Sequence, residues 1–174
     1  VRDCANNGIL VHRTTKGYDG SIISGNRISK IAAIGGGLGW NGNGINIYRA
    51  GQVLIAQNVI SNCAFTFIRA NSGDGVQIIA NNGRECGETG IYCEFSFEGA
   101  VIANNTVDGA ALGVSVRNFN EGGRIAVVRG NIIRNLLPKR PIGTAPDDDT
   151  GIGIYVEYDT SVSGNVIANA TAFG

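Results

Sequence analysis

The sequence predicts an all-β fold, a parallel β-helix (solenoid) of about six coils that carries an asparagine ladder. The chain of 174 residues contains 27 glycines and 19 asparagines, which suit tight turns because both tolerate left-handed backbone conformations. Isoleucine and valine, which favour strands, are spread along the whole chain. A short pattern of residues also recurs six times, at spacings of 23 to 34 residues, as expected for a stack of similar coils.

The recurring pattern is an aliphatic residue, two small or polar residues, an asparagine, one further residue and usually another aliphatic one. Its copies occupy residues 23–28, 55–60, 79–84, 102–107, 128–133 and 162–167. In the third copy the asparagine is Asn82, and this copy departs from the pattern by ending in Arg84. We expect each asparagine to take a left-handed turn conformation and to hydrogen-bond to the asparagine of the next coil. The clearest members of this ladder are Asn26, Asn58, Asn105, Asn131 and Asn165.

A second pattern alternates with the first and consists of a small residue followed by an apolar, a variable and an apolar residue. Its copies lie at residues 8–11, 44–47, 64–67, 90–93, 113–116 and 153–156. Alternation with a period of two indicates a strand with one buried face. A repeat of two short strands without a helix favours one coil of a parallel β-helix.

At the level of families, the chain resembles the right-handed parallel β-helix, or pectin-lyase-like, superfamily over its whole length. Its Asn-rich repeats, with FEGAVIANNT at residues 97–106 and NFNEGG at 118–123, are similar to a bacterial β-helix repeat family exported by the twin-arginine route, whose activity is unassigned. The resemblance implies a periplasmic or secreted bacterial protein. The numbered chain has no initiator methionine and no leader, so we expect residues 1–174 to be one domain of a longer chain.

Charge and hydropathy narrow the possible partners. The 14 basic and 14 acidic side chains balance, and no run of lysine and arginine is present, which argues against a nucleic-acid partner. No apolar stretch approaches the roughly 18 residues that a membrane-spanning helix needs.

Two coils are longer than the others, with inserts at residues 30–43 and 136–150. Both inserts follow the asparagine turn, so we expect them at the same corner of the solenoid, four coils or about 19 Å apart. They would either wall a groove or be tolerated insertions. Trp40 lies in the first insert and is either a stacking platform for a sugar ring or a cover for local apolar surface. The surrounding GLGWNG formally matches a dinucleotide fingerprint, but no helix follows it.

The first strand of each coil is expected to point alternate side chains outward, which gives a polar and aromatic face. Tyr48, Tyr92 and Tyr155 would stack on sugar rings there, and Arg117 would pair with a carboxylate of an acidic sugar. In the third coil the outward residues are expected to be Thr66 and Ile68.

On the same face, Glu94, Arg117 and Glu157 are expected in one column. The two carboxylates would be about 9.6 Å apart, near the upper limit of the separation in inverting glycosidases. Glu94 and Glu157 are therefore the acid and base candidates if the chain is a polysaccharide lyase or glycoside hydrolase. A salt-bridged ladder of Glu, Arg and Glu is the structural alternative, and the arginine would disfavour a protonated acid.

The second strand of each coil is expected to expose an aliphatic column. Its members are Ile22, Leu54, Ile78, Val101 and Val127. Exposed aliphatic side chains in a row predict self-association through this face, unless a bulge turns them inward.

Metal and sulfur chemistry is sparse. Asp147, Asp148 and Asp149 would offer oxygen ligands to calcium, or form a solvated loop tip; we expect no other cofactor. Cys63 and Cys86 fall at matching corners of neighbouring coils, where a disulfide is geometrically possible, and Cys93 is expected in the core.

Two functions remain open on the sequence alone. One is a carbohydrate-active protein that binds, and possibly cleaves, a polysaccharide or oligosaccharide along the first-sheet groove. The other is a non-catalytic envelope, adhesion or assembly module that uses the aliphatic face.

Overall fold

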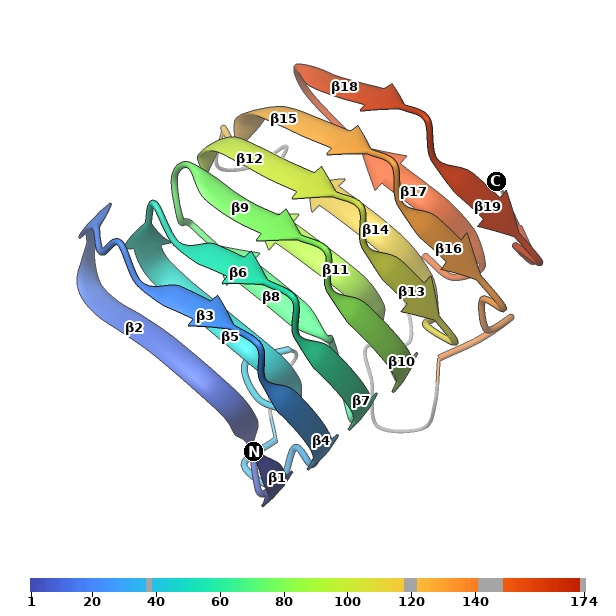
Figure 1. The fold of residues 1–174 in the computed structure, drawn as a ribbon, viewed down its shortest axis with the longest axis horizontal. Helices are drawn as coiled ribbons and strands as arrows, with labels where there is room; N and C mark the ends of the chain where they lie inside the picture. The colour runs from blue at the N-terminus through green and yellow to red at the C-terminus, as the bar shows by residue number, and fades with distance from the viewer. Residues whose placement is uncertain (37–38, 118–121, 141–148, 173–174) are drawn as a thin grey trace.

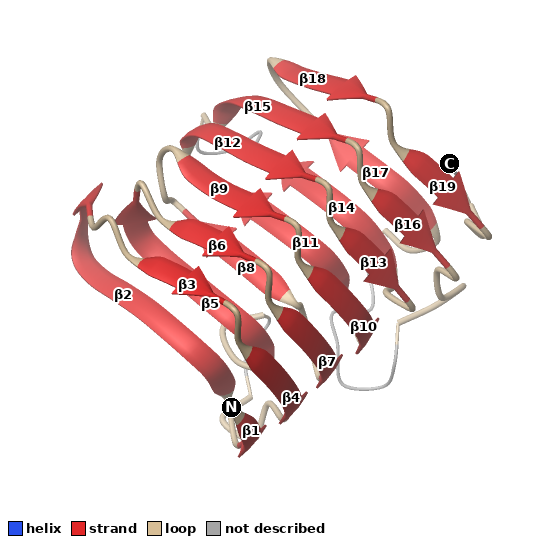
Figure 2. Cartoon of the chain, in the orientation of Figure 1, coloured by secondary structure: helices blue, strands red, loops and turns tan. Residues whose placement is uncertain are grey.

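The computed structural model describes residues 1–36, 39–117, 122–140 and 149–172. This part of the chain folds into nineteen strands, and it contains no helix (Figure 2). The strands form three parallel sheets, and the chain passes through the sheets in the same order in every coil (Figure 1). The predicted β-helix of six coils is confirmed, and the described residues include no long apolar helix that would cross a membrane.

The three sheets, named A, B and C here, share the same stacking order. Sheet A contains β1 (Arg2–Cys4), β4 (Arg27–Ile31), β7 (Val59–Cys63), β10 (Asn82–Cys86), β13 (Thr106–Asp108), β16 (Ile132–Arg134) and β19 (Val166–Ala168). Sheet B contains β2 (Asn7–Tyr18), β5 (Asn43–Gly51), β8 (Ile68–Asn71), β11 (Thr89–Glu94), β14 (Leu112–Arg117) and β17 (Ile152–Val156). Sheet C contains β3 (Ile22–Ser24), β6 (Leu54–Ala56), β9 (Val76–Ile79), β12 (Glu98–Ala103), β15 (Arg124–Arg129) and β18 (Thr160–Ser163).

The core is a set of aliphatic columns that run along the solenoid axis. In sheet B one column places Ile45, Ile68, Ile91 and Val114 in register, and all four are buried. In sheet C the corresponding column is Ile23, Ile55, Ile78, Ile102 and Val128. Each buried aliphatic side chain stabilises the fold by about 1.5–3 kcal/mol relative to exposure.

The asparagine ladder follows sheet C and is present as predicted in five of its six members. The side-chain oxygen of Asn105 accepts hydrogen bonds from the backbone N–H of Asn81 at 2.9 Å and from its Nδ2 at 3.0 Å. The Asn105 Nδ2 donates to Asn131 Oδ1 and to the carbonyl of Ile78. The same pattern joins Asn26, Asn58, Asn81, Asn105, Asn131 and Asn165.

Two details of the predicted ladder are wrong. The third member is Asn81 rather than Asn82, because Ile78 and not Ile79 pairs with Ile55. The left-handed residue of each turn also precedes the asparagine instead of being the asparagine. These positions are Gly25, Gln57, Ala80, Asn104, Gly130 and Gly164, all with φ between 56° and 67°.

The third coil also departs from prediction at its sheet A and sheet B strands. Gly83 occupies the sheet A position that Ile60 and Val107 fill in the neighbouring coils, so it leaves a gap in the core. The Phe67 ring fills this gap, since a Cβ on Gly83 would lie 2.3 Å from Phe67 Cδ2. Residues 64–67 therefore form a corner, and the strand begins at Ile68, which is buried rather than outward as expected.

The two long inserts leave sheet A and enter sheet B at the same corner, as predicted. The first runs over residues 32–42, between β4 and β5, and the second over residues 135–151, between β16 and β17. At this corner Cys63 and Cys86 are also in register on β7 and β10. Both are buried free thiols, so the possible disulfide is not formed, and Cys93 is buried in the core as expected.

Candidate functional site

The outward face of sheet B carries two columns of polar and aromatic side chains. The first column is Leu10, Asn46, Arg69, Tyr92, Ser115 and Tyr155. The second is His12, Tyr48, Asn71, Glu94 and Arg117. Glu157 follows β17 and its backbone N–H donates to the Val116 carbonyl, which puts it beside Arg117. The predicted outward positions are thus confirmed except in the third coil, where Arg69 and Asn71 replace Thr66 and Ile68.

An aromatic cluster of Trp40, Tyr48 and His12 stands at one end of this face. The Tyr48 and His12 rings stack with centroids 5.2 Å apart, and Trp40 meets Tyr48 edge-on at 5.0 Å. The Arg49 guanidinium lies 4.8 Å from the centre of the Tyr48 ring. Trp40 nevertheless keeps 42% of its surface exposed, so the indole is both supported and accessible. Such rings suit stacking because they are large, rigid and amphipathic.

The loop that carries Trp40 is fixed to sheet B by its backbone. The carbonyl of Trp40 accepts from Nδ2 of Asn46 at 3.0 Å, of Asn7 at 3.3 Å and of Asn43 at 3.4 Å. The carbonyl of Gly39 accepts from Asn43 Nδ2 at 2.9 Å and from Arg69 Nη1 at 2.5 Å. Asn43, Asn46 and Arg69 are all buried, so their side-chain donors are shielded from water and bond to the loop carbonyls instead.

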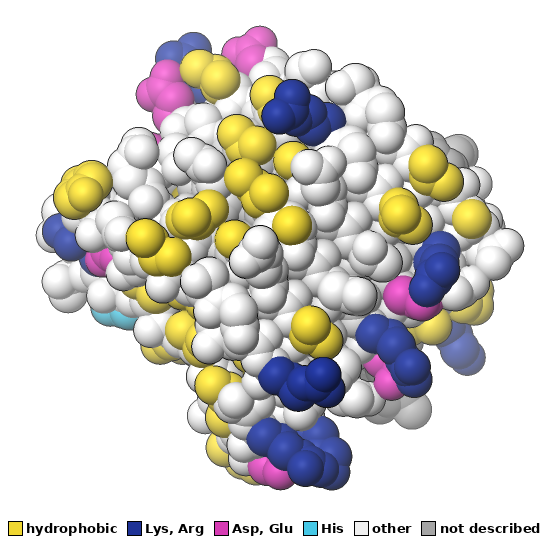
Figure 3. All heavy atoms as spheres, viewed as in Figure 1, with side chains coloured by type: hydrophobic (Ala, Val, Ile, Leu, Met, Phe, Trp, Pro, Cys, Tyr) yellow, Lys and Arg dark blue, Asp and Glu magenta, His cyan; other side chains and the backbone are white. Residues whose placement is uncertain are grey.

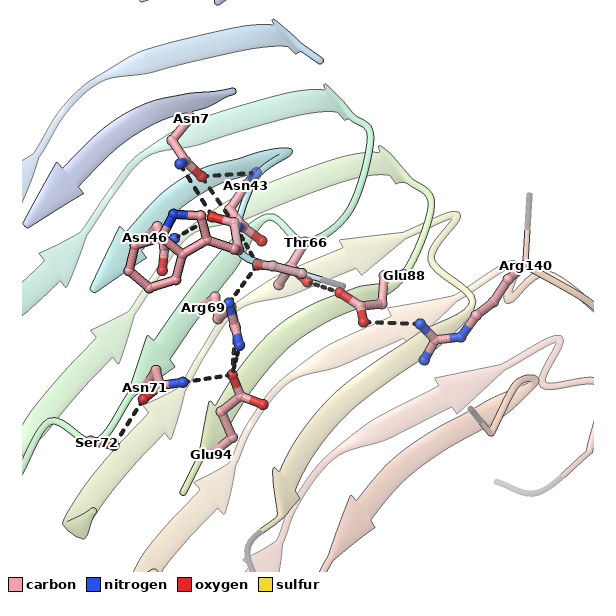
Figure 4. A network of polar contacts seen from close by, with 12 residues as sticks. Asn7, Asn43, Asn46, Thr66, Arg69, Asn71, Ser72, Glu88, Glu94 and Arg140 are labelled. Atoms are coloured by element: carbon pink, nitrogen blue, oxygen red, sulfur yellow. Dashed lines mark hydrogen bonds and ion pairs between the residues drawn. The ribbon is translucent and has the colours of Figure 1, made fainter. Parts of the chain in front are cut away.

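Arg69 and Glu94 form a buried ion pair beneath this loop (Figure 4). Arg69 Nε and Nη2 both contact Glu94 Oε1, and Asn71 Nδ2 donates to the same oxygen at 3.2 Å. Burial is the largest influence on the Glu94 carboxyl and raises its pKa, while the charge and hydrogen bond of Arg69 oppose that shift. Glu94, one of the two acid–base candidates, is thus 5% exposed and held by two partners.

A second buried charge, Glu88, links the two inserts (Figure 4). Its Oε2 accepts from the Thr66 hydroxyl at 2.8 Å, and its Oε1 lies 3.0 Å from Nη1 of Arg140 in the second insert. A Cβ on Gly39 of the first insert would lie 3.7 Å from Glu88 Oε2. Both inserts therefore reach Glu88, and the groove expected between them is bridged at this point.

At the other end of the face, Arg117 contacts both an aromatic ring and a carboxylate. Its guanidinium lies 4.1 Å from the centre of the Tyr155 ring and donates from Nη2 to Asp149 Oδ2 at 2.6 Å. Burial acts to lower the Arg117 pKa, but the hydrogen bond to Asp149 and the electrostatic effects of Tyr92, Asp149 and Tyr155 together outweigh it, and the pKa is raised. Arg117 is thus beside Glu94 in register, as predicted, yet its partner is Asp149.

One of the three calcium candidates, Asp149, lies at the same place. The Asp149 carboxylate is bound to a guanidinium, and Asp147 and Asp148 lie outside the described residues. Within the described ranges no three His, Cys, Asp or Glu side chains gather into a metal-binding group. The Asp149 carboxylate pairs with Arg117 in this structure, and calcium binding at Asp147, Asp148 and Asp149 stays a prediction.

An open hollow of about 250 Å³ adjoins this face at the corner between sheets B and C. It extends from the ends of β2 and β5 to the end of β8 and the residues that follow β8 and β11. It is lined by Lys16, Tyr48, Arg49, Asn71, Ser72, Phe95 and Ser96. Because Tyr48 belongs to both features, the hollow is continuous with the aromatic cluster.

Several functional residues were missed from the sequence. Arg69 and Asn71 were missed because the Phe67 ring mimics the apolar position of a strand, which moved the expected strand by three residues. Arg140 and the amides of Asn43 and Asn46 gave no signal, since their role depends on where the inserts fold. The only hint in the sequence was its low charge: charged residues make up 16% of the chain, so each charged residue in a strand pattern is unusual.

The face formed by sheets A and C is different in character (Figure 3). Ile22 is 70% exposed and Leu54, Val101 and Val127 are half-buried, as expected for the aliphatic column. Ile78 is wrongly placed in that column, because it points into the core and exposed Gln77 takes its position between Leu54 and Val101. The aliphatic column is therefore interrupted at its centre.

Comparison with known proteins agrees with this architecture. A family model described as a right handed beta helix region matches residues 7–174. Searches of the curated proteins and of the solved structures gave no significant match. With nearly the whole chain matched and successive coils stacked into three parallel sheets, the protein belongs to the right-handed β-helix family.

Proposed function

We propose that this β-helix repeat protein binds an oligosaccharide, or a segment of polysaccharide, along the outer face of sheet B. The observation that carries the proposal is the Trp40, Tyr48 and His12 cluster, in which a half-exposed indole stands on a loop fixed by buried donors. Sugar rings present flat C–H faces, and a rigid aromatic platform binds them at a small entropic cost.

The rest of the face extends the site along the axis. Tyr92 and Tyr155 occupy the same column two coils apart, about 9.6 Å by strand spacing, which suits contacts to successive sugar units. Arg117 lies beside Tyr155 and would donate to ring hydroxyls or to a sugar carboxylate. Such a ligand would be met in the periplasm or outside the cell.

Binding is favoured over cleavage by the surroundings of Glu94. Glu94 is buried and its carboxylate oxygen Oε1 is shared between Arg69 and Asn71, which leaves it poorly placed to approach a glycosidic bond. General acid–base chemistry needs both groups within hydrogen-bond reach of the substrate. If cleavage does occur, Glu94 and Glu157 remain the candidate pair.

Calorimetric titration of neutral and uronic oligosaccharides against the wild type, Tyr92→Ala and Tyr158→Ala tests the proposal. Tyr158 is an exposed tyrosine outside the two columns and serves as the matched control. We expect at least one oligosaccharide to bind, and to bind about tenfold more weakly to Tyr92→Ala alone. Absence of binding across the panel, or equal affinity of all three proteins, contradicts the proposal.

A second candidate is an assembly module that self-associates through the face of sheets A and C. It is favoured by exposed aliphatic residues on both sheets, Ile22, Val59, Ile132 and Val166, whose coverage would gain roughly 25 cal/mol per Å². Sedimentation velocity should then show a concentration-dependent oligomer that Ile22→Gln weakens. A monomer at all concentrations excludes this candidate and leaves the sugar site unaffected.

A further inference from the structure

We propose that Arg69 and Glu94 are a positioning pair, which holds the Trp40 loop against sheet B and thereby sets the orientation of the indole. Neither residue touches the ligand in this role. The part of the proposal that concerns affinity rests on the proposed oligosaccharide site, whereas the part that concerns Trp40 stands without it.

Arg69 has a hydrogen-bond partner outside the ion pair, the carbonyl of Gly39. Glu94 binds Nε and Nη2, and this leaves Nη1 directed at the carbonyl of Gly39, the residue before Trp40. Gly39 has a φ of 87°, and a Cβ there would lie 3.6 Å from the Arg69 carbon Cζ. Glycine thus supplies the left-handed conformation at this position, whereas a Cβ would make only ordinary contact with the guanidinium.

A buried ion pair is a poor way to stabilise a strand. Removing two charges from water costs several kcal/mol, and apolar residues of similar volume often give equal or greater stability. In the neighbouring coils the column of Arg69 is occupied by Asn46 and Tyr92, so the fold does not require an arginine there. What the guanidinium adds is a rigid set of donors whose direction is fixed by the carboxylate.

The side-chain amides of Asn43 and Asn46 also hold the Trp40 loop against sheet B. Asn43 and Asn46 donate to the same two carbonyls, so two consecutive peptide units of the loop are held by buried side chains of sheet B. The indole is then pressed edge-on against Tyr48 at 5.0 Å. Glu94 acts in this arrangement by orienting Arg69, which differs from the acid or base role that the sequence suggests.

Trp40 is the only tryptophan, so its fluorescence reports on this loop alone. The key variant is Arg69→Lys, which keeps a cation for Glu94 but loses the fork that reaches Gly39. We expect its Trp40 emission to shift to longer wavelength and acrylamide quenching to increase, with an unchanged far-ultraviolet spectrum. The control is Arg124→Lys, because Arg124 pairs with Glu98 on the adjacent coil in sheet C but on the surface.

Two further variants separate positioning from stability. Arg69→Met/Glu94→Leu removes the buried charges together, so it should fold and still release Trp40. Glu94→Gln retains an oxygen acceptor for Arg69, so its Trp40 signal should stay close to wild type, whereas Glu94→Ala should resemble Arg69→Lys.

Oligosaccharide affinity is measured on the same proteins and should fall about tenfold in Arg69→Lys, the worth of one lost hydrogen bond. Unchanged Trp40 emission and quenching in the folded Arg69→Lys and Arg69→Met/Glu94→Leu variants overturns the proposal. If no oligosaccharide binds even the wild type but the Trp40 signal of the variants changes, the positioning role is supported and only the proposed ligand is rejected.

Discussion

A ladder asparagine is buried and polar, yet each interior member has all its hydrogen-bonding groups satisfied. Asn105 accepts two bonds from Asn81 and donates to Asn131 and to the Ile78 carbonyl. Removing its side chain would leave buried donors and an acceptor without partners, which costs more than the loss of one exposed contact.

We therefore expect Asn105→Ala to lower the free energy of unfolding by about 1–3 kcal/mol more than Arg124→Ala. Arg124 is an exposed residue whose pair with Glu98 spans 3.3 Å. Urea unfolding of both variants measures the difference. Equal midpoints with unchanged m-values would contradict a stabilising ladder.

The left-handed position before each ladder asparagine gives a second test. Ala80 has a φ of 56° where three other coils have glycine, and a left-handed alanine is strained. Ala80→Gly should raise the free energy of unfolding by about 1 kcal/mol. Ala168→Gly, in an exposed strand without positive φ, should lower it instead, and stabilisation by both changes would rule out backbone strain as the cause.

Among the elements, the third coil shows what sequence patterns can and cannot predict. Five ladder asparagines, the strand positions of coils four to six and both insert positions follow directly from the repeat, because the same packing recurs in every coil. Asn81, Arg69 and Asn71 do not follow, since the exchange of volume between Gly83 and Phe67 links a position in sheet A to a corner residue 16 positions earlier in the chain.

Adding a methyl group at Gly83, where the Phe67 ring already fills the space, tests this exchange. Gly83→Ala would place a methyl group 2.3 Å from the Phe67 ring and should cost about 1–3 kcal/mol through overpacking. Gly17→Ala is the control, because its Cβ would meet only Arg13 Nη2 at 3.8 Å. Equal thermal midpoints for the two variants would show that Phe67 does not fill the gap.

The buried pair between β8 and β11 predicts a pH dependence of stability. Burial raises the pKa of Glu94 above its ordinary value of 4.5. The stability linked to its protonated form is thus present below that ordinary value and is lost as the pH rises through the raised pKa.

Glu94→Gln removes this titration, so its stability relative to wild type should increase as the pH rises from about 4 to 8. Urea unfolding across this range measures the slope, and Glu98→Gln, in the exposed pair with Arg124, is the matched control. A constant difference between Glu94→Gln and wild type at every pH would show that Glu94 titrates in the folded protein as it does in the unfolded chain.

For the whole molecule, the β-helix supplies a rigid scaffold and the inserts supply the features that distinguish its faces. The family and the coil number could be predicted because a solenoid repeats one packing solution. The candidate site could be predicted only in part, because Tyr48, Tyr92, Arg117 and Tyr155 lie on one face by period, whereas the position of Trp40 and its support depend on where the inserts fold. Residues far apart in sequence, such as Gly39, Glu88 and Arg140, meet only in three dimensions.

The central claim is that the outer face of sheet B is a ligand-binding surface centred on Trp40. The most direct measurement is acrylamide quenching of Trp40 fluorescence during titration with the oligosaccharide panel. The 42% of the residue surface that is now exposed should become protected, with an emission shift to shorter wavelength and saturable binding. Quenching that stays unchanged at saturating concentrations of every oligosaccharide would contradict the claim.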